Sequence, residues 1–266
     1  MSVAYSSITY EVSAGVGLLT LNREKALNAL DRQITDELHK VLAEAAGDPA
    51  VRCLLITGAG RGFSAGADLT QLEDSYRKGE TVPLGDMLRD GYNRIILPIV
   101  HMEKPVVAAV NGVAAGAGAS LALACDFRIA SDKARFFQAF IKVGLVQDSG
   151  ASYFLPRLVG LAKAMELAML GDIIDANEAL RIGLVTKVVP HDSLMDEARA
   201  FAEQLASGPT RALGLSKRAM YFGADNDLEQ TMDYEADLQA QTSLTHDHME
   251  GVKAFLDKRE PKFEGR

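Results

Sequence analysis

The chain has 266 residues, of which 48% are hydrophobic, and its net charge at pH 7 is −8. This length and composition suit one globular domain with a large buried core and an appendage. The negative charge argues against a protein that attracts nucleic acid electrostatically. The first residues contain neither a basic segment nor an apolar run, so we expect no secretory signal and a cytoplasmic location.

The two cysteines, Cys53 and Cys125, lie in apolar segments without metal-binding spacing. We predict buried, reduced thiols. Among the histidines, His246 and His248 are two positions apart, which places them on different sides of a helix. With no cysteine cluster nearby, the sequence predicts no metal site.

The first elements in the chain are a hairpin, a helix and a strand. Apolar residues alternate with polar ones from Ile8, and a glycine-containing turn leads to a second strand ending at Leu21. Asp31 is a suitable N-cap for a helix whose apolar residues recur with helical spacing until Gly47. A strand is expected over 51–57.

Two stretches share one plan, an apolar strand that runs into a Gly/Ala turn and a helix. They are residues 52–69 and residues 104–130. The uncharged run over 105–125 is long enough to cross a bilayer, but it is Ala-rich and contains Asn111, Ser120 and three glycines, so we predict a buried strand, turn and helix and no membrane association. The first amides of a helix lack partners within it, and donors from two such turns can stabilise one oxyanion.

The other segments complete an α/β pattern. We expect an irregular, mobile loop over 76–86 and a helix over 87–101 that Pro98 strains. Further expected elements are helices over 150–160, over 161–170 and from Ala176, a strand over 184–189, and helices throughout 192–258. We divide the chain into a core domain, 1–195, and a C-terminal helical region, 196–266.

The segments GRGFSAGADL and AAVNGVAAGAGASLALACD resemble the crotonase (enoyl-CoA hydratase/isomerase) superfamily, and matching segments run from LNREKALNAL to PKFEGR. The resemblance implies a β-spiral of ββα units with a C-terminal helical layer that builds trimers, often paired into hexamers. It implies an acyl-CoA thioester as substrate. Coenzyme A would then be part of the substrate, and no separate cofactor is expected.

The resemblance also implies the residues of the site. The amides of Ala65 and Ala117 would hold the thioester oxygen. The other residues expected to contact the substrate are Gly66, Ala67, Asp68, Leu69 and Gly116 of the two turns, and Phe140. Lys25 and Ala26 are candidate coenzyme A contacts, although Lys25 could simply be a solvated surface lysine. Phe255, Lys258 and Phe263 are candidates from the same or a neighbouring chain, and plain helix packing or solvation explains them equally well.

The resemblance to hydratases fails at two positions. Hydratases of this superfamily carry glutamates where this chain has Ser120 and Phe140. Adding water needs a base for the water and an acid for carbon, so the sequence favours a reaction that one carboxylate can perform. Asp148 resembles the proton-shuttling aspartate of the branch that contains 1,2-epoxyphenylacetyl-CoA isomerases and single-carboxylate enoyl-CoA isomerases. From the residues alone, Asp148 could instead cap the helix that follows.

We therefore predict an isomerase of unsaturated or ring-derived acyl-CoA esters, as in phenylacetate or fatty acid degradation, and enoyl-CoA hydratase is the competing enzyme activity. Dehalogenation is disfavoured because Asn93 occupies the position where related dehalogenases have a histidine base. Gln147 and Ala151 replace the Pro and Gly that are common beside this aspartate, so the resemblance does not define the geometry of that turn. A chain of this kind could also bind acyl-CoA without catalysis, or bind RNA. The helix over 31–48 is net acidic, which disfavours RNA.

Overall fold

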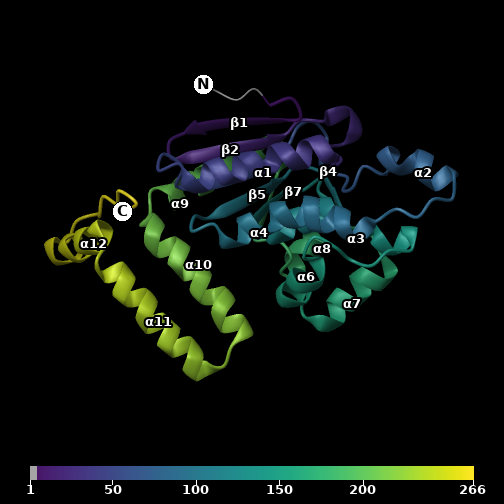
Figure 1. The fold of residues 1–266 in the computed structure, drawn as a ribbon. Coiled ribbons are helices and arrows are strands. Elements are labelled where there is room, and N and C mark those ends of the chain that lie inside the picture. The colour runs from purple at the N-terminus through teal and green to yellow at the C-terminus, as the bar shows by residue number, and fades with distance from the viewer. Residues whose placement is uncertain (1–4) are drawn as a thin grey trace.

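The computed structural model describes residues 5–266, and its centre is a six-stranded sheet (Figure 1). The order of its strands is β1-β2-β3-β5-β7-β10, with an antiparallel β1–β2 hairpin and parallel pairing elsewhere. The strands are β1 (Ile8–Ser13), β2 (Val16–Leu21), β3 (Cys53–Gly58), β5 (Val106–Val110), β7 (Phe127–Ser131) and β10 (Lys187–Val189).

A second sheet follows the first around a spiral. Its order is β4-β6-β8-β9, from β4 (Gly62–Ser64), β6 (Val113–Ala115), β8 (Arg135–Phe137) and β9 (Ile174–Asp175). Each of β3, β5 and β7 leads directly into β4, β6 or β8, and one or more helices follow before the next turn. This repetition is the predicted β-spiral of ββα units, and the α/β fold is confirmed.

Helices cover both faces of the main sheet because its central strands are apolar on both faces. On one face lie α1 (Arg32–Gly47) and α4 (Asn93–His101), which share a core cluster with Leu54 and Ile56. The other face carries α9 (Leu194–Ala206), which packs against Cys53 and Leu55. Alternate residues of β3 thus enter opposite layers, as the two-residue period of a strand requires.

The remaining helices surround the second sheet or extend beyond the core. They are α2 (Glu73–Arg77), α3 (Leu84–Met87), α5 (Ala117–Ala124), α6 (Ala151–Val159), α7 (Leu161–Leu170), α8 (Ala176–Arg181), α10 (Thr210–Asp225), α11 (Leu228–Ser243) and α12 (His246–Asp257). In Figure 1, α10, α11 and α12 project from the core, whereas α9 lies on the sheet. The division of the chain at 195/196 stays a prediction. Among residues 5–266, no helix combines the length and hydrophobicity needed to cross a membrane.

The helix expected over 87–101 is interrupted. A π-helical segment, Leu88–Tyr92, lies between α3 and α4, and α4 contains Pro98. A π turn inserts an extra residue and changes which side chains share a face. Part of the loop expected over 76–86 is helical, because α2 ends at Arg77 and α3 begins at Leu84.

The C-terminal segment is fastened to both α12 and the core. The Asp247 side chain is 2% exposed and accepts hydrogen bonds from the amides of Glu264 and Gly265, both at 2.7 Å. From the core, Arg52 donates to the Phe263 carbonyl at 3.1 Å. These contacts fix the position of α12 relative to the sheet.

Asp247→Asn should loosen this segment, because a carboxylate that accepts two backbone bonds becomes an amide. A buried charge-assisted bond contributes about 1.5–3 kcal/mol, and we expect a loss of stability of that order. Denaturant unfolding measures the loss, and hydrogen exchange of residues 259–266 locates it. Asp257→Asn is the control, since that side chain is 51% exposed. Unchanged exchange in the Asp247 variant would contradict the anchoring role.

Candidate active site

The first Gly/Ala turn follows β4. The Ala65 amide donates to the Leu27 carbonyl at 2.9 Å, and the Gly66 amide donates to Ser64 Oγ at 3.2 Å. The prediction that the Ala65 amide holds a substrate oxygen is therefore wrong, because this donor is already used within the protein.

Ala67 has the available amide in this turn. Leu30 forms an isolated parallel bridge with Ala67, in which Leu30 N–H donates to the Gly66 carbonyl at 2.7 Å and Asp68 N–H donates to the Leu30 carbonyl at 3.1 Å. In a parallel bridge, the residue between these two bonds directs its own amide away from the partner strand. Within residues 5–266, the Ala67 amide has no hydrogen-bond acceptor.

The second turn ends at Gly116, whose φ is +49°, and α5 begins at Ala117. As the first helical residue, Ala117 has no carbonyl four residues earlier within the helix to receive its amide proton. No backbone acceptor for this amide exists in the described part of the chain. Every residue of α5 is buried, so the positive end of its dipole lies inside the protein.

The two turns touch because glycine occupies the contact. Gly66 has a φ of +87°, and a β-carbon there would lie 2.6 Å from the Ala115 carbonyl oxygen and 3.3 Å from the Ala117 nitrogen. A β-carbon on Gly118 would likewise overlap Ser64. Only glycine permits this approach, which places the first turn directly against the start of α5.

Arg23 holds the first turn in position. Its Nη2 pairs with Asp31 and Asp68, each at 2.9 Å, and Nη1 donates to the Ala29 carbonyl. Although burial opposes ionisation of Asp68, hydrogen bonds from Thr70 and Arg23 and the Arg23 charge hold its pKa below the usual value. The carboxylates of Asp31 and Asp68 are therefore both ion-paired with Arg23.

Asp148 lies at the end of the segment that leads into α6. Ser120 on α5 donates to the Asp148 carbonyl at 3.2 Å, which ties this backbone to the oxyanion helix. Burial raises the pKa of the Asp148 carboxyl, and a hydrogen bond from Ser149 Oγ at 2.8 Å partly offsets that increase. The residue preceding α6 is Gly150, and within residues 5–266 no side chain caps the helix. The helix-capping interpretation of Asp148 is therefore excluded.

A cavity of about 590 Å³ lies in front of the first turn. Its lining includes Ala67, Asp68 and Leu69 from this turn and Asp148 from the segment that leads into α6. Residues 83–92 supply much of the remaining wall. The cavity thus joins an unpartnered amide, a half-buried carboxylate and space for an acyl group.

Known proteins share this architecture along the whole chain. A sequence profile described as enoyl-CoA hydratase/isomerase matches residues 11–266. The chain belongs to this family. It is 42% identical over 259 residues to the 1,2-epoxyphenylacetyl-CoA isomerase of Escherichia coli (strain K12), covering 97% of this chain and 98% of that protein.

Other relatives in the family have hydratase names. The chain is 42% identical over 264 residues to a probable enoyl-CoA hydratase of Rhodobacter capsulatus, covering 99% of this chain and all of that protein. The crystal structure of a putative enoyl-CoA hydratase/isomerase from Mycobacterium abscessus superposes with a TM-score of 0.92 at 40% identity, covering 97% of this chain and all of that one. The family is therefore shown, whereas these names divide between isomerase and hydratase.

The two positions expected to carry hydratase carboxylates hold other side chains in this family member. The hydroxyl of Ser120 donates within the protein, to the carbonyls of Gly116 and Asp148. Phe140 is 6% exposed, and its ring lies 3.8 Å from the place of a β-carbon on Gly116. An apolar ring therefore packs beside the second turn.

Tyr92 is a cavity residue that the sequence did not single out. Its hydroxyl donates to the Leu30 carbonyl at 3.1 Å, and burial, together with the charges of Asp148 and Asp68, raises its pKa. Tyr92 lines the cavity, whereas Asn93 is exposed. The hydrogen bond links the segment over 83–92 to the strand beside Ala67.

The predicted coenzyme A contacts lie outside this cavity. Lys25 is exposed and Ala26 half-buried in a 3-10 helix, Glu24–Ala26. Phe255 and Lys258 are exposed at the end of α12, and Figure 1 draws α12 at the opposite end of the molecule from α3, which lines the cavity. Their role in binding the substrate stays a prediction. Within residues 5–266, no three His, Cys, Asp or Glu side chains are grouped closely enough to hold a metal ion.

Proposed function

We propose that this chain is an acyl-CoA isomerase that works through a thioester enolate. Membership of the enoyl-CoA hydratase/isomerase family supports an acyl-CoA substrate. The observation that carries the proposal is the state of Asp148. Among the acids that line the cavity, Asp31 and Asp68 pair with Arg23, Asp36 pairs with Arg32, and Asp86 pairs with Arg89. Within the described chain Asp90 and Asp148 have no cation partner, and of these two Asp90 is exposed whereas Asp148 is half-buried.

The reaction requires one proton carrier. With the thioester oxygen held by the amides of Ala67 and Ala117, the Asp148 carboxylate would remove a proton from carbon and return it elsewhere on the acyl chain. Negative charge that develops on the oxygen would be stabilised by the two amides and the start of α5. A pKa raised by burial makes Asp148 a better base than an exposed aspartate.

The acyl group of the substrate is either a β,γ-unsaturated chain or a ring epoxide. The second option is supported by the similarity to the protein named 1,2-epoxyphenylacetyl-CoA isomerase. Both substrates need the same oxyanion site and one acid/base group.

The decisive experiment offers purified protein 3-hexenoyl-CoA and crotonyl-CoA in parallel. We expect conversion of the first to its 2-enoyl isomer to exceed water addition to the second by at least about 100-fold in kcat/KM, equivalent to about 2.7 kcal/mol in transition-state stabilisation. Faster hydration of crotonyl-CoA would establish a hydratase. Similarity to a relative named crotonyl-CoA hydratase supports this alternative. Binding of both esters without turnover would instead indicate a non-catalytic binder, or a different acyl group.

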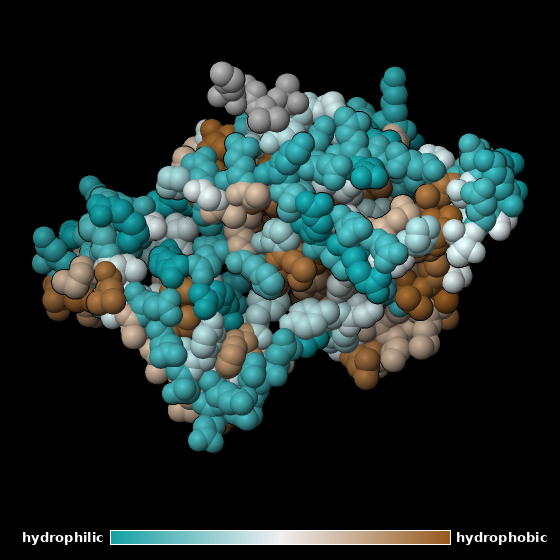
Figure 2. Space-filling model, in the orientation of Figure 1, coloured by the Kyte–Doolittle hydropathy of each residue, from teal (hydrophilic) through white to brown (hydrophobic). Residues whose placement is uncertain are grey.

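We also propose that the protein acts as a trimer or a pair of trimers. Figure 2 shows apolar side chains exposed over α7 and α12. The most exposed of them are Leu161, Met169, Met249, Phe255 and Leu256. Large exposed apolar patches mark contact surfaces. Size-exclusion chromatography with light scattering measures the molar mass of the assembly. A monomeric mass at micromolar protein concentration would contradict the proposed trimer.

A further inference from the structure

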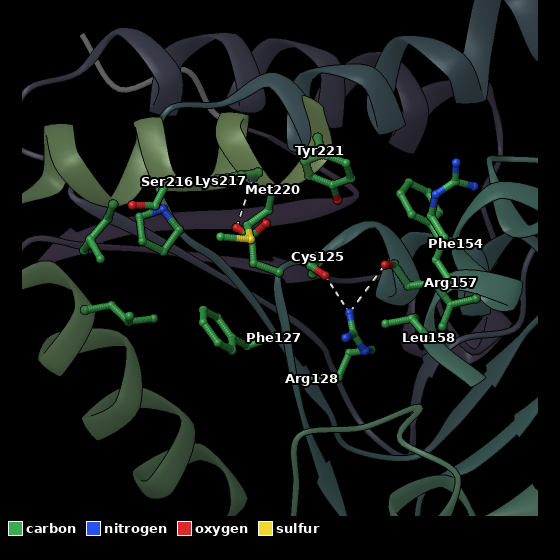
Figure 3. A pocket seen from close by; sticks show the side chains of 15 residues that line it. Cys125, Phe127, Arg128, Phe154, Arg157, Leu158, Ser216, Lys217, Met220 and Tyr221 are labelled. Carbon is green, nitrogen blue, oxygen red and sulfur yellow. Dashed lines mark hydrogen bonds and ion pairs between the residues drawn. The ribbon is translucent and has the colours of Figure 1, made fainter. Parts of the chain in front are cut away.

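A second cavity, of about 390 Å³, lies between α10, α6 and the start of β7. It shares no lining residue with the cavity that contains Asp148. Figure 3 shows Ser216, Lys217, Met220 and Tyr221 reaching it from α10. Its wall is mainly apolar, with Leu123, Phe127, Phe154, Leu158, Leu205, Leu213, Met220 and Tyr221. The proposed isomerisation uses none of these residues.

The charged residues of this wall do not balance. Lys217 pairs with Asp126 at 3.0 Å, and Arg157 pairs with Asp225 at 2.6 Å. Arg128 is 5% exposed, and no carboxylate of the described chain lies within ion-pair distance of it. Within the described chain, Lys217 and Arg128 therefore share the single carboxylate of Asp126, which leaves one excess positive charge in a largely apolar surrounding.

Hydrogen bonds to backbone carbonyls hold the Arg128 guanidinium at the wall. Nε donates to Leu184 at 2.7 Å, while Nη1 donates to Cys125 at 2.5 Å and to Leu123 at 3.4 Å. Figure 3 shows the two Nη1 bonds at the edge of the cavity. Within residues 5–266, Nη2 donates to no acceptor. The carbonyls fix the orientation of the group and leave one nitrogen for a ligand.

We propose that this cavity binds a small amphipathic carboxylate, with its anionic head on Arg128 Nη2 and its hydrocarbon body among the apolar side chains. A carboxylate supplies the single negative charge that is missing, and ionic hydrogen bonds to guanidinium are stronger than neutral ones. A phosphate monoester would bring a second negative charge without a partner. The apolar wall selects a ligand with a hydrocarbon body over a bare inorganic anion.

Octanoate is the probe, and calorimetry at neutral pH is the measurement. We expect a dissociation constant of about 1 mM or below, and binding of 1-octanol at least about tenfold weaker because it lacks the charge. Saturating butyryl-CoA, a saturated ester directed at the Asp148 cavity, should leave octanoate binding unchanged. Competition between the two would place octanoate in the Asp148 cavity and overturn the proposal.

Ser216→Trp locates the site, because Ser216 is an exposed residue that lines the cavity. The added ring should reduce octanoate affinity at least about tenfold by occupying space that the ligand needs. Ser243→Trp is the matched control, an exposed serine at the end of α11 that does not line the cavity. Equal affinity in the two variants would reject the site.

Arg128→Lys tests whether the carboxylate of the ligand binds Arg128, because this variant keeps the positive charge but loses the planar guanidinium group. A folded variant with weakened octanoate binding and unchanged butyryl-CoA binding supports the proposal. Undiminished octanoate binding would overturn it. If this variant does not fold, the Ser216 and Ser243 pair still decides the question. No octanoate binding by the wild type, for example because a second copy of the chain fills the cavity, would also overturn it.

Discussion

Asp148→Asn should lower kcat for isomerisation of 3-hexenoyl-CoA by about 10²–10⁴-fold, the usual contribution of a general acid/base group. The amide has the shape of the carboxylate but cannot take a proton from carbon. Binding of the CoA ester should change little, because the oxyanion amides belong to Ala67 and Ala117. Steady-state kinetics and calorimetry with butyryl-CoA separate the two effects.

Asp90→Asn provides the matched control for this experiment. Asp90 also lines the cavity, but it is exposed and lies on the π-helical segment. Its replacement should leave kcat within about twofold, because the proposed reaction uses Asp148 as its one acid/base group and exposed substitutions usually have small effects. Equal losses in the two variants would show that negative charge around the cavity matters and that Asp148 has no special role.

The pH dependence follows from the raised pKa of Asp148. As a base, Asp148 must be ionised, so kcat/KM should rise with pH through a pKa above the ordinary value of about 3.9. The Asn variant should lack this step. A pH profile of the wild type that is flat from pH 4 to pH 7 would contradict the assignment.

The same shift has a consequence for stability. Because the folded pKa is raised, the stability contributed by this group is present below the unfolded pKa and lost as pH rises through the folded pKa. At pH 7 the ionised carboxylate therefore destabilises the fold. Asp148→Asn should melt at a higher temperature than the wild type at pH 7, and the difference should shrink towards acidic pH. A lower melting temperature at pH 7 would contradict the buried charge.

The sequence predicted the two turns correctly but misplaced one donor within the first. Local composition marks residues 62–69 as a Gly/Ala turn, yet which amide is free depends on Leu27 and Leu30, far back in the chain. Leu27 accepts from Ala65, and the Leu30 bridge leaves Ala67 unpaired. Such long-range backbone pairing has no signature in the turn itself.

Tyr92 was missed for a different reason. In a regular helix over 87–101, the 3.6-residue period would determine which side chains face the core. The π-helical segment directly before α4 changes that period, so the side of the helix on which Tyr92 lies could not be predicted. The second cavity was also unpredictable, because Arg128 and Ser216 are brought together only by the packing of α10 against the core. Asp148, in contrast, stood out as an acid within an apolar run.

Gly66→Ala should abolish most activity while Gly62→Ala leaves it nearly unchanged. At Gly66, φ is +87° and a β-carbon would lie 2.6 Å from the Ala115 carbonyl oxygen, so the two turns must separate. At Gly62, the nearest atom to an added β-carbon is a Leu27 side-chain carbon at 3.6 Å, an ordinary contact. The two glycines lie four residues apart, before and within the same turn.

Loss of one oxyanion donor typically costs about 10²–10³-fold in kcat, and we expect at least this for Gly66→Ala. Strain at a positive φ adds a stability loss of about 1–3 kcal/mol. Activity should be compared at a temperature where unfolding curves show each variant to be folded. A folded Gly66→Ala protein with wild-type kcat would mean that the amides of Ala67 and Ala117 do not act on one oxygen. Retained butyryl-CoA binding with lost turnover would instead show that the contact between the turns serves the transition state.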